Sequence, residues 1–511
     1  MAKQRNQPAE HSERMKGTNR DQIEAKTAKK GEGWSKTLTF CLLTLQTVKT
    51  IKPEENWEER VVIEIITPGV TTPVTNAMGL SFFEDFGPNQ LLPNGERIHY
   101  VLGNEIQRLH SGVLNEKTSF KNVKAYACNL PSCQQSAISH LMGIFPKVEN
   151  NDISSDIEDL LDPPYPIDIE RLNSTSALPH KMKPFDLITE SDEKDVIFLT
   201  NLRKSCPYQK KKNPFWGKHG GLLPADLEWM LLKYSKQLRH LKFFGKDVGG
   251  VGQKHLSLIS QSLTAFHHFT GGYFPGYKKE DLYNFQLIEG MRILGKYAGG
   301  PRRQRLYNTH KFKIILSEFA KAVKLKASPK KYILFAADRA NMLALLAAFN
   351  KTSYSCLRKR LKNPSKNRTE TESCRDPAPP GSSLTLTLKF HNATNKYYVS
   401  SMYNGFQLKV CQGNKYALCE YSVFLQGVKT MVTDDFFKVC GNDKVNAVEE
   451  NKLRKAIRKE TYALKVVAGV FVFELAVCVL ICVWKNNQKN KSVVQMTLMD
   501  NISKEKFSLA K

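Results

Sequence analysis

The chain has 511 residues, of which 41% are hydrophobic and 24% are charged, and its formal net charge at pH 7 is +27. This composition is that of a globular protein and excludes a chain that is mostly disordered. Basic residues gather in four clusters, at 203–212, 302–305, 358–368 and 452–459. Such clusters attract acidic glycans or anionic lipid head groups, or they are ordinary solvated surface. No zinc-finger, homeodomain or RNA-binding motif is present, so we predict no nucleic-acid partner.

The first 50 residues predict a disordered, basic N-terminus followed by a secretion signal. Residues 1–36 are polar and rich in Gln, Asn and Lys, which is typical of disorder. Residues 37–50 contain an apolar run, Leu38–Val48, that has the length of a signal-peptide core and follows several lysines. No small-x-small cleavage site comes after it, so an uncleaved anchor and a wrongly assigned start codon are the alternatives.

Residues 51–455 are predicted to form one folded domain that begins with alternating strands and helices. Val61–Ile66 is a β-branched run that ends at a Gly/Pro turn, which predicts a strand. A second strand is expected at Asn122–Ala127 and a helix at Ser132–Ile144, before Pro146. The acidic, Pro-rich stretch 147–185 predicts an exposed loop.

The middle of the domain predicts a helical insertion, a cap within about 147–300. Apolar residues recur there and beyond at three-to-four spacing, which predicts helices at 224–244, 256–269, 280–297 and 312–325. The end of the domain predicts strands at 332–336, 384–390, 396–402 and 405–410, and helices at 339–349 and 420–425. This order is that of an α/β core with a helical cap. Ligands of such folds bind beyond the carboxyl ends of the strands, so we expect the loops after Ile66 and Ala336 to share one pocket.

Val466–Trp484 is predicted to be a single transmembrane helix, because it is apolar except for Glu474. At ~1.5 Å per residue, about 20 residues cross the hydrocarbon core of a bilayer. Glu474 would lie near the bilayer centre, where it either pairs with a partner helix or is tolerated in its protonated form. Residues 485–511 would then be a cytoplasmic tail, and 51–455 a lumenal or extracellular ectodomain.

Cysteine and sequon usage agree with a secretory route to a lysosome-like or cell-surface membrane. Between the predicted signal and the membrane helix there is an even number of cysteines, which fits an oxidising compartment. They are Cys128, Cys133, Cys206, Cys356, Cys374, Cys411, Cys419 and Cys440, and their pairing stays open. Glycosylation sequons occur at Asn173, Asn350, Asn367 and Asn392. No zinc or P-loop signature appears, so we predict no metal and no cofactor.

Several segments, in the same order, resemble the membrane-bound histidine acid phosphatases of the lysosomal and prostatic type. The strand and turn Arg60–Pro73 is similar to the opening signature Arg-His-Gly-x-Arg-x-Pro. The other segments are Gly95–Gly103, Ser136–Pro146, Tyr332–Leu346 and the cysteines Cys411, Cys419 and Cys440. The resemblance covers about 61–440. It implies a phosphoglycerate-mutase-like α/β core with a helical cap, and hydrolysis of phosphomonoesters at acid pH.

The residues that carry this chemistry in the family are mostly absent. The family uses a nucleophilic His, Arg side chains that bind phosphate in a bidentate way, and a His-Asp pair that supplies the acid. In the alignment the nucleophile falls on Pro68, the arginines on Thr67, Thr71 and Tyr126, and the second His on Ala337. The signature residues Gly69 and Pro73 are kept, and so is the acid Asp338.

Each group near this site has a second interpretation. Asp338 is a candidate acid, but between a strand and a helix it is more typical of an N-cap. The threonines either donate to an anion or satisfy turn backbone. His219, in a Gly-rich loop, is a candidate replacement nucleophile that lies off the core strands.

Two functions therefore stay open. One is an inactive pseudophosphatase that acts as a binding ectodomain, with a phosphorylated or polyanionic ligand. The other is an active acid phosphatase that uses substitute residues, so whether the chain is an enzyme is undecided. We favour the first, because loss of a covalent nucleophile removes many orders of magnitude in rate.

Overall fold

The computed structural model describes residues 57–440 except 77, 116–119, 147–183, 207–221, 236–237, 239–252, 326–329, 363–370, 372 and 412–416. Several predictions lie outside these residues: those for 1–36, 37–50, 466–484 with Glu474, and 485–511, and those for His219, Asn173 and Asn367. Within the described part, no helix is both long enough and apolar enough to cross a membrane.

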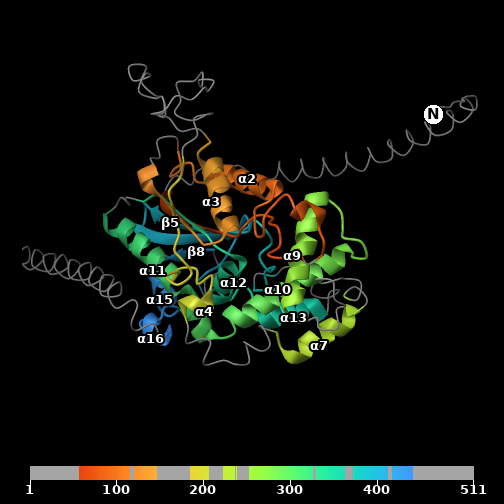
Figure 1. Cartoon of the computed structure of the whole chain (residues 1–511). Helices are drawn as coiled ribbons and strands as arrows, with labels where there is room; N and C mark the ends of the chain where they lie inside the picture. The colour runs from red at the N-terminus through yellow and green to blue at the C-terminus, as the bar shows by residue number, and fades with distance from the viewer. Residues whose placement is uncertain are drawn as a thin grey trace, which may run out of the picture.

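A mixed β-sheet of eight strands lies at the centre of the described residues (Figure 1). Its order is β3-β2-β4-β1-β5-β6-β7, with β8 paired to β6. The strands are β1 (Trp57–Ile66), β2 (Val123–Ala127), β3 (Leu187–Ile188), β4 (Tyr332–Ala336), β5 (Ser383–His391), β6 (Lys396–Tyr403), β7 (Phe406–Gln407) and β8 (Leu418–Glu420). The first four are parallel, and β5 pairs antiparallel with β1 and β6.

β1 is the central strand, because its β-branched side chains are buried on both faces of the sheet. Residues 61–66 are all inaccessible to solvent, as is usual for a strand in a parallel sheet that is covered on both sides. Ile66 pairs with Ala336 of β4 and with Ser383 of β5. The carboxyl ends of β1 and β4 therefore lie level with each other and with the start of the antiparallel β5. The backbone N–H of Ala337 donates to Ile66 O at 2.9 Å, which fixes the start of the two following loops side by side.

Helices cover both faces of the sheet. α2 (Pro93–Leu109) and α3 (Pro131–Ile144) pack on one face, where they meet Val62 and Ile66. α10 (Lys279–Tyr297), α11 (Pro301–Leu325) and α12 (Arg339–Ala348) pack on the other, against Ile63 and Ile65. α7 (Pro224–Lys233), α9 (Gln253–Thr270) and α13 (Tyr354–Lys362) lie to one side (Figure 1). Shorter helices are η1 (Ser81–Phe83), η2 (Phe120–Asn122), α4 (Leu202–Ser205), α15 (Tyr421–Lys429) and α16 (Phe436–Cys440).

Most of the predicted elements match the structure to within a few residues. The strands expected at 122–127, 332–336, 384–390 and 396–402 correspond to β2, β4, β5 and β6. α7 is the first half of the helix expected at 224–244, of which 236–237 and 239–244 lie outside the described residues. The strand expected at 405–410 is only the two residues of β7. The helix expected at 312–325 is the second half of α11, which begins at Pro301.

All eight cysteines expected in an oxidising compartment form disulfide bonds. The pairs are Cys128–Cys133, Cys206–Cys440, Cys356–Cys374 and Cys411–Cys419. The prediction of a disulfide-bonded domain is confirmed, and the structure adds the pairing that spacing left open.

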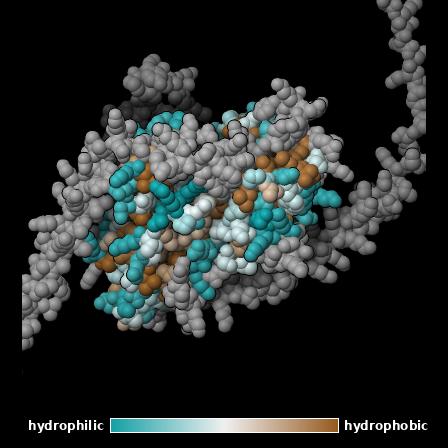
Figure 2. Space-filling model, turned by 90° about the horizontal axis from the view of Figure 1, so that it is seen from below, coloured by the Kyte–Doolittle hydropathy of each residue, from teal (hydrophilic) through white to brown (hydrophobic). Residues whose placement is uncertain are grey.

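The surface of the described residues is mixed in polarity. On the face that Figure 2 shows, hydrophilic residues alternate with smaller hydrophobic areas. The most exposed large apolar side chains, Leu232 and Phe406, belong to separate elements, α7 and β7. Apolar side chains scattered in this way are normal for a globular surface.

Candidate functional site

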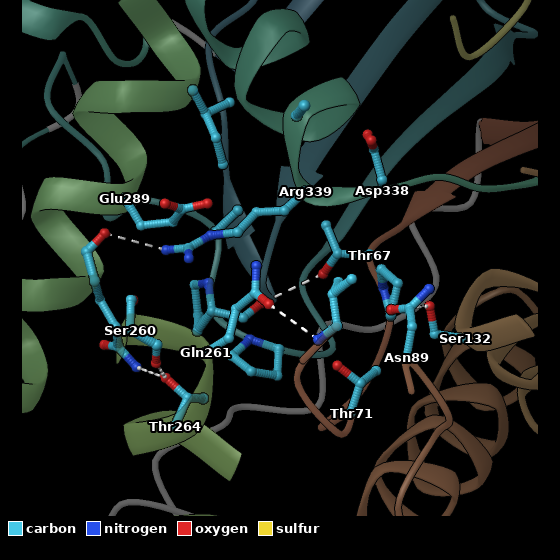
Figure 3. Close-up of a pocket in the computed structure, with 18 of the residues that line it drawn as sticks. Thr67, Thr71, Asn89, Ser132, Ser260, Gln261, Thr264, Glu289, Asp338 and Arg339 are labelled. Atoms are coloured by element: carbon cyan, nitrogen blue, oxygen red, sulfur yellow. Dashed lines mark hydrogen bonds between the residues drawn. The ribbon is translucent and has the colours of Figure 1, made fainter. Parts of the chain in front are cut away.

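A cavity of about 290 Å³ lies beyond the carboxyl ends of β1 and β4. Its walls come from the turn after β1, the start of α12, the facing sides of α9 and α10, and the loop 378–380 (Figure 3). The level ends of β1 and β4 bring the first two segments together, and both were expected to share a pocket. The helices α9 and α10 close it from the other side.

The structure brings five of the seven predicted site residues to this cavity. Thr67, Pro68, Gly69, Thr71 and Asp338 line it, whereas Tyr126 and Ala337 do not. The ring of Tyr126 is buried and stacks on Phe335, with ring centroids 5.0 Å apart. Ala337 is also fully buried. These two positions therefore contribute packing beside the cavity rather than groups inside it.

The turn after β1 satisfies its own polar groups. Thr67 is 1% exposed, and its hydroxyl accepts from the Ser382 N–H at 2.9 Å and donates to Pro379 O at 3.3 Å. The Pro68 carbonyl accepts from the N–H of Gly381 at 2.8 Å. This is the turn-backbone role for Thr67, and it ties the loop 379–382 to the turn without a ligand.

Gly69 is needed because the turn crosses the start of α2 at very short range. A Cβ at Gly69 would lie 2.6 Å from the Gly95 carbonyl oxygen, and a Cβ at Gly95 would lie 2.5 Å from Val70 O. No side chain fits at such distances. Two glycines from separate segments of the resemblance are thus explained by one backbone crossing.

Asp338 adopts the geometry of a helix N-cap. Its Oδ1 accepts from the backbone N–H of Asn341 at 2.9 Å and from the Asn341 side-chain amide at 2.7 Å. Figure 3 shows its carboxylate turned away from Thr67. Burial raises the pKa of Asp338, with smaller opposing effects from the Asn341 hydrogen bonds and from Lys311. The carboxylate therefore caps α12 and is not aimed at a bound molecule.

The sequence did not reveal three charged residues of the cavity. Arg292 donates from two nitrogens to the two carboxylate oxygens of Glu289, both at 2.9 Å. Burial opposes the charge on Glu289, but Arg292 and Arg339 together hold its pKa below the ordinary value. Arg339 donates to the carbonyls of Pro377 at 2.6 Å and Gln286 at 3.4 Å. Arg339 could have been predicted as a cavity residue, because it directly follows Asp338. Glu289 and Arg292 could not, because they come from a helix far away in sequence.

The cavity offers no group for phosphoryl transfer by a nitrogen nucleophile. Its lining, as far as the chain is described, contains no histidine, cysteine or lysine. Its hydroxyls belong to Tyr297 and to Ser and Thr residues, and among the described residues none of these Ser and Thr hydroxyls hydrogen-bonds to a histidine that could act as a base. Across the described residues, no group of three or more His, Cys, Asp or Glu side chains is placed to hold a metal ion.

Comparison with known proteins shows which kind of fold this chain has. No protein-family model and no curated protein matches the sequence. Solved structures do match it, and among them are phytases and multiple inositol polyphosphate phosphatases of the histidine acid phosphatase fold. The family resemblance of the sequence is therefore confirmed at the level of the fold.

Three of these structures illustrate how similar the folds are and how much of each chain is covered. Apo phytase from Hafnia alvei has a TM-score of 0.50 at 12% identity, covering 76% of this chain and 99% of the phytase. The phytase from Citrobacter braakii has a TM-score of 0.49 at 13% identity, covering 75% and 99%. The phytase from D. castellii has a TM-score of 0.47 at 13% identity, covering 79% and 85%. At such identities the likeness describes the fold alone.

Proposed function

We propose that this protein is a phosphatase-like binding protein without phosphatase activity, in which the cavity beyond β1 and β4 receives the ligand. We further propose that its core is phosphoglycerate-mutase-like with a helical cap, and that 466–484 anchors it in a membrane of the secretory pathway. The observation that carries the proposal is Pro68, which lines the cavity where the family places its nucleophile.

The arginines of the cavity give a second reason to propose that the chain is inactive. Phosphoryl transfer depends on cations that are free to meet the charge on the transferred group. Both arginines of the cavity already donate to partners in the protein: Arg292 to Glu289, and Arg339 to two backbone carbonyls. A phosphomonoester would have to compete with these partners for part of each guanidinium group, which has five N–H donors in all.

One observation favours the second candidate, an active phosphatase with substitute residues. Two guanidinium groups, Arg292 and Arg339, do line a cavity of small-molecule size together with Asp338. This candidate lacks a nucleophile among the described lining residues, which is why we place it second.

The test is phosphatase activity of the purified full chain in detergent, with p-nitrophenyl phosphate from mildly acidic to neutral pH. Circular dichroism confirms that each sample is folded. A folded, inert native chain supports the proposal. Turnover at the rate of an active acid phosphatase refutes it.

Two variants give this test its controls. The first restores every family position through Thr67→Arg, Pro68→His, Thr71→Arg, Tyr126→Arg and Ala337→His, and activity in it would support the alignment. The second is Pro68→His alone, which returns the nucleophile without the cations. We expect the single change to leave the chain inert.

The secretory part of the proposal is supported by the sequons in the described residues. Asn350 and Asn392 are both exposed, and Asn392 lies in the turn between β5 and β6. Treatment of the protein from eukaryotic cells with an endoglycosidase is expected to lower its apparent mass. An unchanged mass in both the wild type and Asn392→Gln would contradict a lumenal ectodomain.

A further inference from the structure

The charged side chains that line the cavity already have partners within the protein. They are two guanidinium groups, Arg292 and Arg339, and two carboxylates, of which Glu289 interacts with both arginines and Asp338 caps α12. The pair between Glu289 and Arg292 is bidentate, with exposed side-chain fractions of 5% and 20%. A site for a polyanion needs uncompensated cations. In this cavity Glu289 pairs with Arg292 and Arg339 donates to backbone carbonyls, although the chain as a whole carries +27.

The remaining polar lining consists of neutral hydroxyl and amide groups. Figure 3 shows them on opposite sides of the cavity, with Asn89, Ser132 and Thr71 facing groups from α9. The α9 groups are Ser260, Gln261 and Thr264. Hydroxyls both donate and accept, and side-chain amides offer one acceptor and two donors. A ligand that both donates and accepts hydrogen bonds at several points, without charge, matches such a lining.

Apolar surfaces complete the walls. One wall is formed by Pro68, Ala378, Pro379 and Pro380, and others by Leu130, Val74 and Ile293. Small-molecule sites typically combine apolar walls with a few placed polar groups, in volumes from about 300 Å³ upward. At about 290 Å³ this cavity has room for one small molecule. Aliphatic walls suit the C–H faces of a saturated ring, and the polar groups suit its hydroxyls.

We propose that the cavity binds a neutral, hydroxyl-rich molecule the size of one hexose sugar. This neutral ligand takes the place of the phosphorylated or polyanionic ligand that the sequence led us to expect. The inference rests on the proposed function, because it requires binding without turnover. Buried hydroxyl and amide groups would make the site selective, since an analogue without the matching hydroxyl leaves them unpaired.

The test is isothermal titration of the full chain with D-glucose, D-galactose, D-mannose and N-acetylglucosamine, in a detergent without a sugar head group. Inorganic phosphate and phenyl phosphate are titrated as the anionic alternatives. We expect at least one sugar to bind with a Kd in the millimolar range or tighter, with little dependence on salt. Phosphate and phenyl phosphate are expected to bind more weakly than that sugar.

A matched pair of threonines on α9 shows whether the sugar occupies this cavity. The hydroxyls of Thr264 and Thr270 both donate to the carbonyl four residues earlier, at 2.8 Å, but only Thr264 lines the cavity. Thr264→Val removes a hydroxyl from the cavity at constant shape and is expected to weaken the sugar about tenfold. Thr270→Val makes the same chemical change outside the cavity and should leave the affinity unchanged.

The outcomes separate the ligand from the proposed function. Absence of binding by every sugar, or equal affinity of Thr264→Val and wild type, overturns the sugar site. Tighter binding of phosphate or phenyl phosphate also overturns it and leaves a non-catalytic binding protein in place. Hydrolysis of phenyl phosphate overturns the proposed function, and the sugar proposal with it.

Discussion

Lowering the pH from 7 to 5 is expected to destabilise the protein, because two buried histidines remain neutral in the folded chain. Burial lowers the pKa of His99 and of His310 from 6.5 to about 3. His99 is completely buried on α2, with its ring centroid 5.9 Å from that of His140, and Glu64 only partly opposes the shift. His310 lies on α11 against the ring of Phe436, at 4.5 Å between ring centroids.

The magnitude follows from proton linkage. Below pH 6.5 the unfolded chain protonates each of these histidines, whereas the folded chain does not until about pH 3. The free energy of unfolding therefore falls as the pH falls, by about 1.4 kcal/mol per unit and per histidine well below pH 6.5. Between pH 7 and pH 5 this amounts to about 2 kcal/mol for each histidine and about 4 kcal/mol for both. Such a loss is large beside a typical total of roughly 5–15 kcal/mol.

Buried carboxyl groups also make stability depend on pH, but they act in a different pH range or in the opposite direction. Glu64 and Glu289 have pKa values held below 4.5, so they add a loss of stability only at more acidic pH. Burial raises the pKa of Asp338, so its protonation favours the folded chain and opposes the trend. Comparison of variants, rather than the wild-type curve alone, isolates the histidines.

The assay is urea unfolding of the full chain at pH 7, 6 and 5, followed by near-UV circular dichroism. His99→Leu and His310→Leu replace each ring by an apolar group that does not titrate. Each variant should lose about half of the wild-type decrease. A wild-type stability that is constant from pH 7 to 5, or an unchanged decrease in both buried variants, would refute the reasoning.

Three further predictions concern the scaffold. Gly143→Ala places a Cβ 2.1 Å from the Tyr100 carbonyl oxygen of α2, and should lower the free energy of unfolding by about 3 kcal/mol in a urea titration. Lys311→Met leaves three buried acceptors without their donor and should cost about 2 kcal/mol. Because burial lowers the pKa of Lys311 to about 7, the wild type should gain stability from pH 7 to 9, and this variant should not. The double change Cys206→Ser and Cys440→Ser opens a disulfide that spans 234 residues and should lower stability by about 5 kcal/mol, measured against the wild type without reductant.

The strands and helices next to the cavity were predictable, because their sequences carry strong local signals. Val61–Ile66 is a β-branched run that ends in a Gly/Pro turn, and β4 is apolar throughout. α13 was missed because it has few apolar residues and several basic ones. Its buried residues are the apolar Leu357 and Leu361 and the charged Arg360. α2 carries two glycines in its interior, which argue against a helix until the crossing with α3 and the turn is known.

Of the site, only the residues in the loops directly after β1 and β4 were predictable, because the family resemblance covers these two segments. Pro68 and Asp338 follow from the strands they terminate, and the structure places both at the cavity. Tyr126 was expected at the cavity too, but it turns to the ring of Phe335 on the neighbouring strand. Glu289 and Arg292 come from α10, and no local pattern says that this helix face meets the end of β1.

On the function that we propose, the contacts around the turn explain why phosphatase chemistry would need more than one substitution. A phosphatase site keeps its cations and donors uncompensated until the substrate arrives, since they must stabilise charge that develops in the transition state. Here the corresponding groups are completed within the protein: the Thr67 hydroxyl by the loop 379–382, and Arg292 by Glu289. Pro68→His would return a nucleophile to a cavity in which Arg292 is already paired with Glu289. A pocket whose arginines already have partners in the protein suits the uncharged ligand that we propose better than it suits a phosphate.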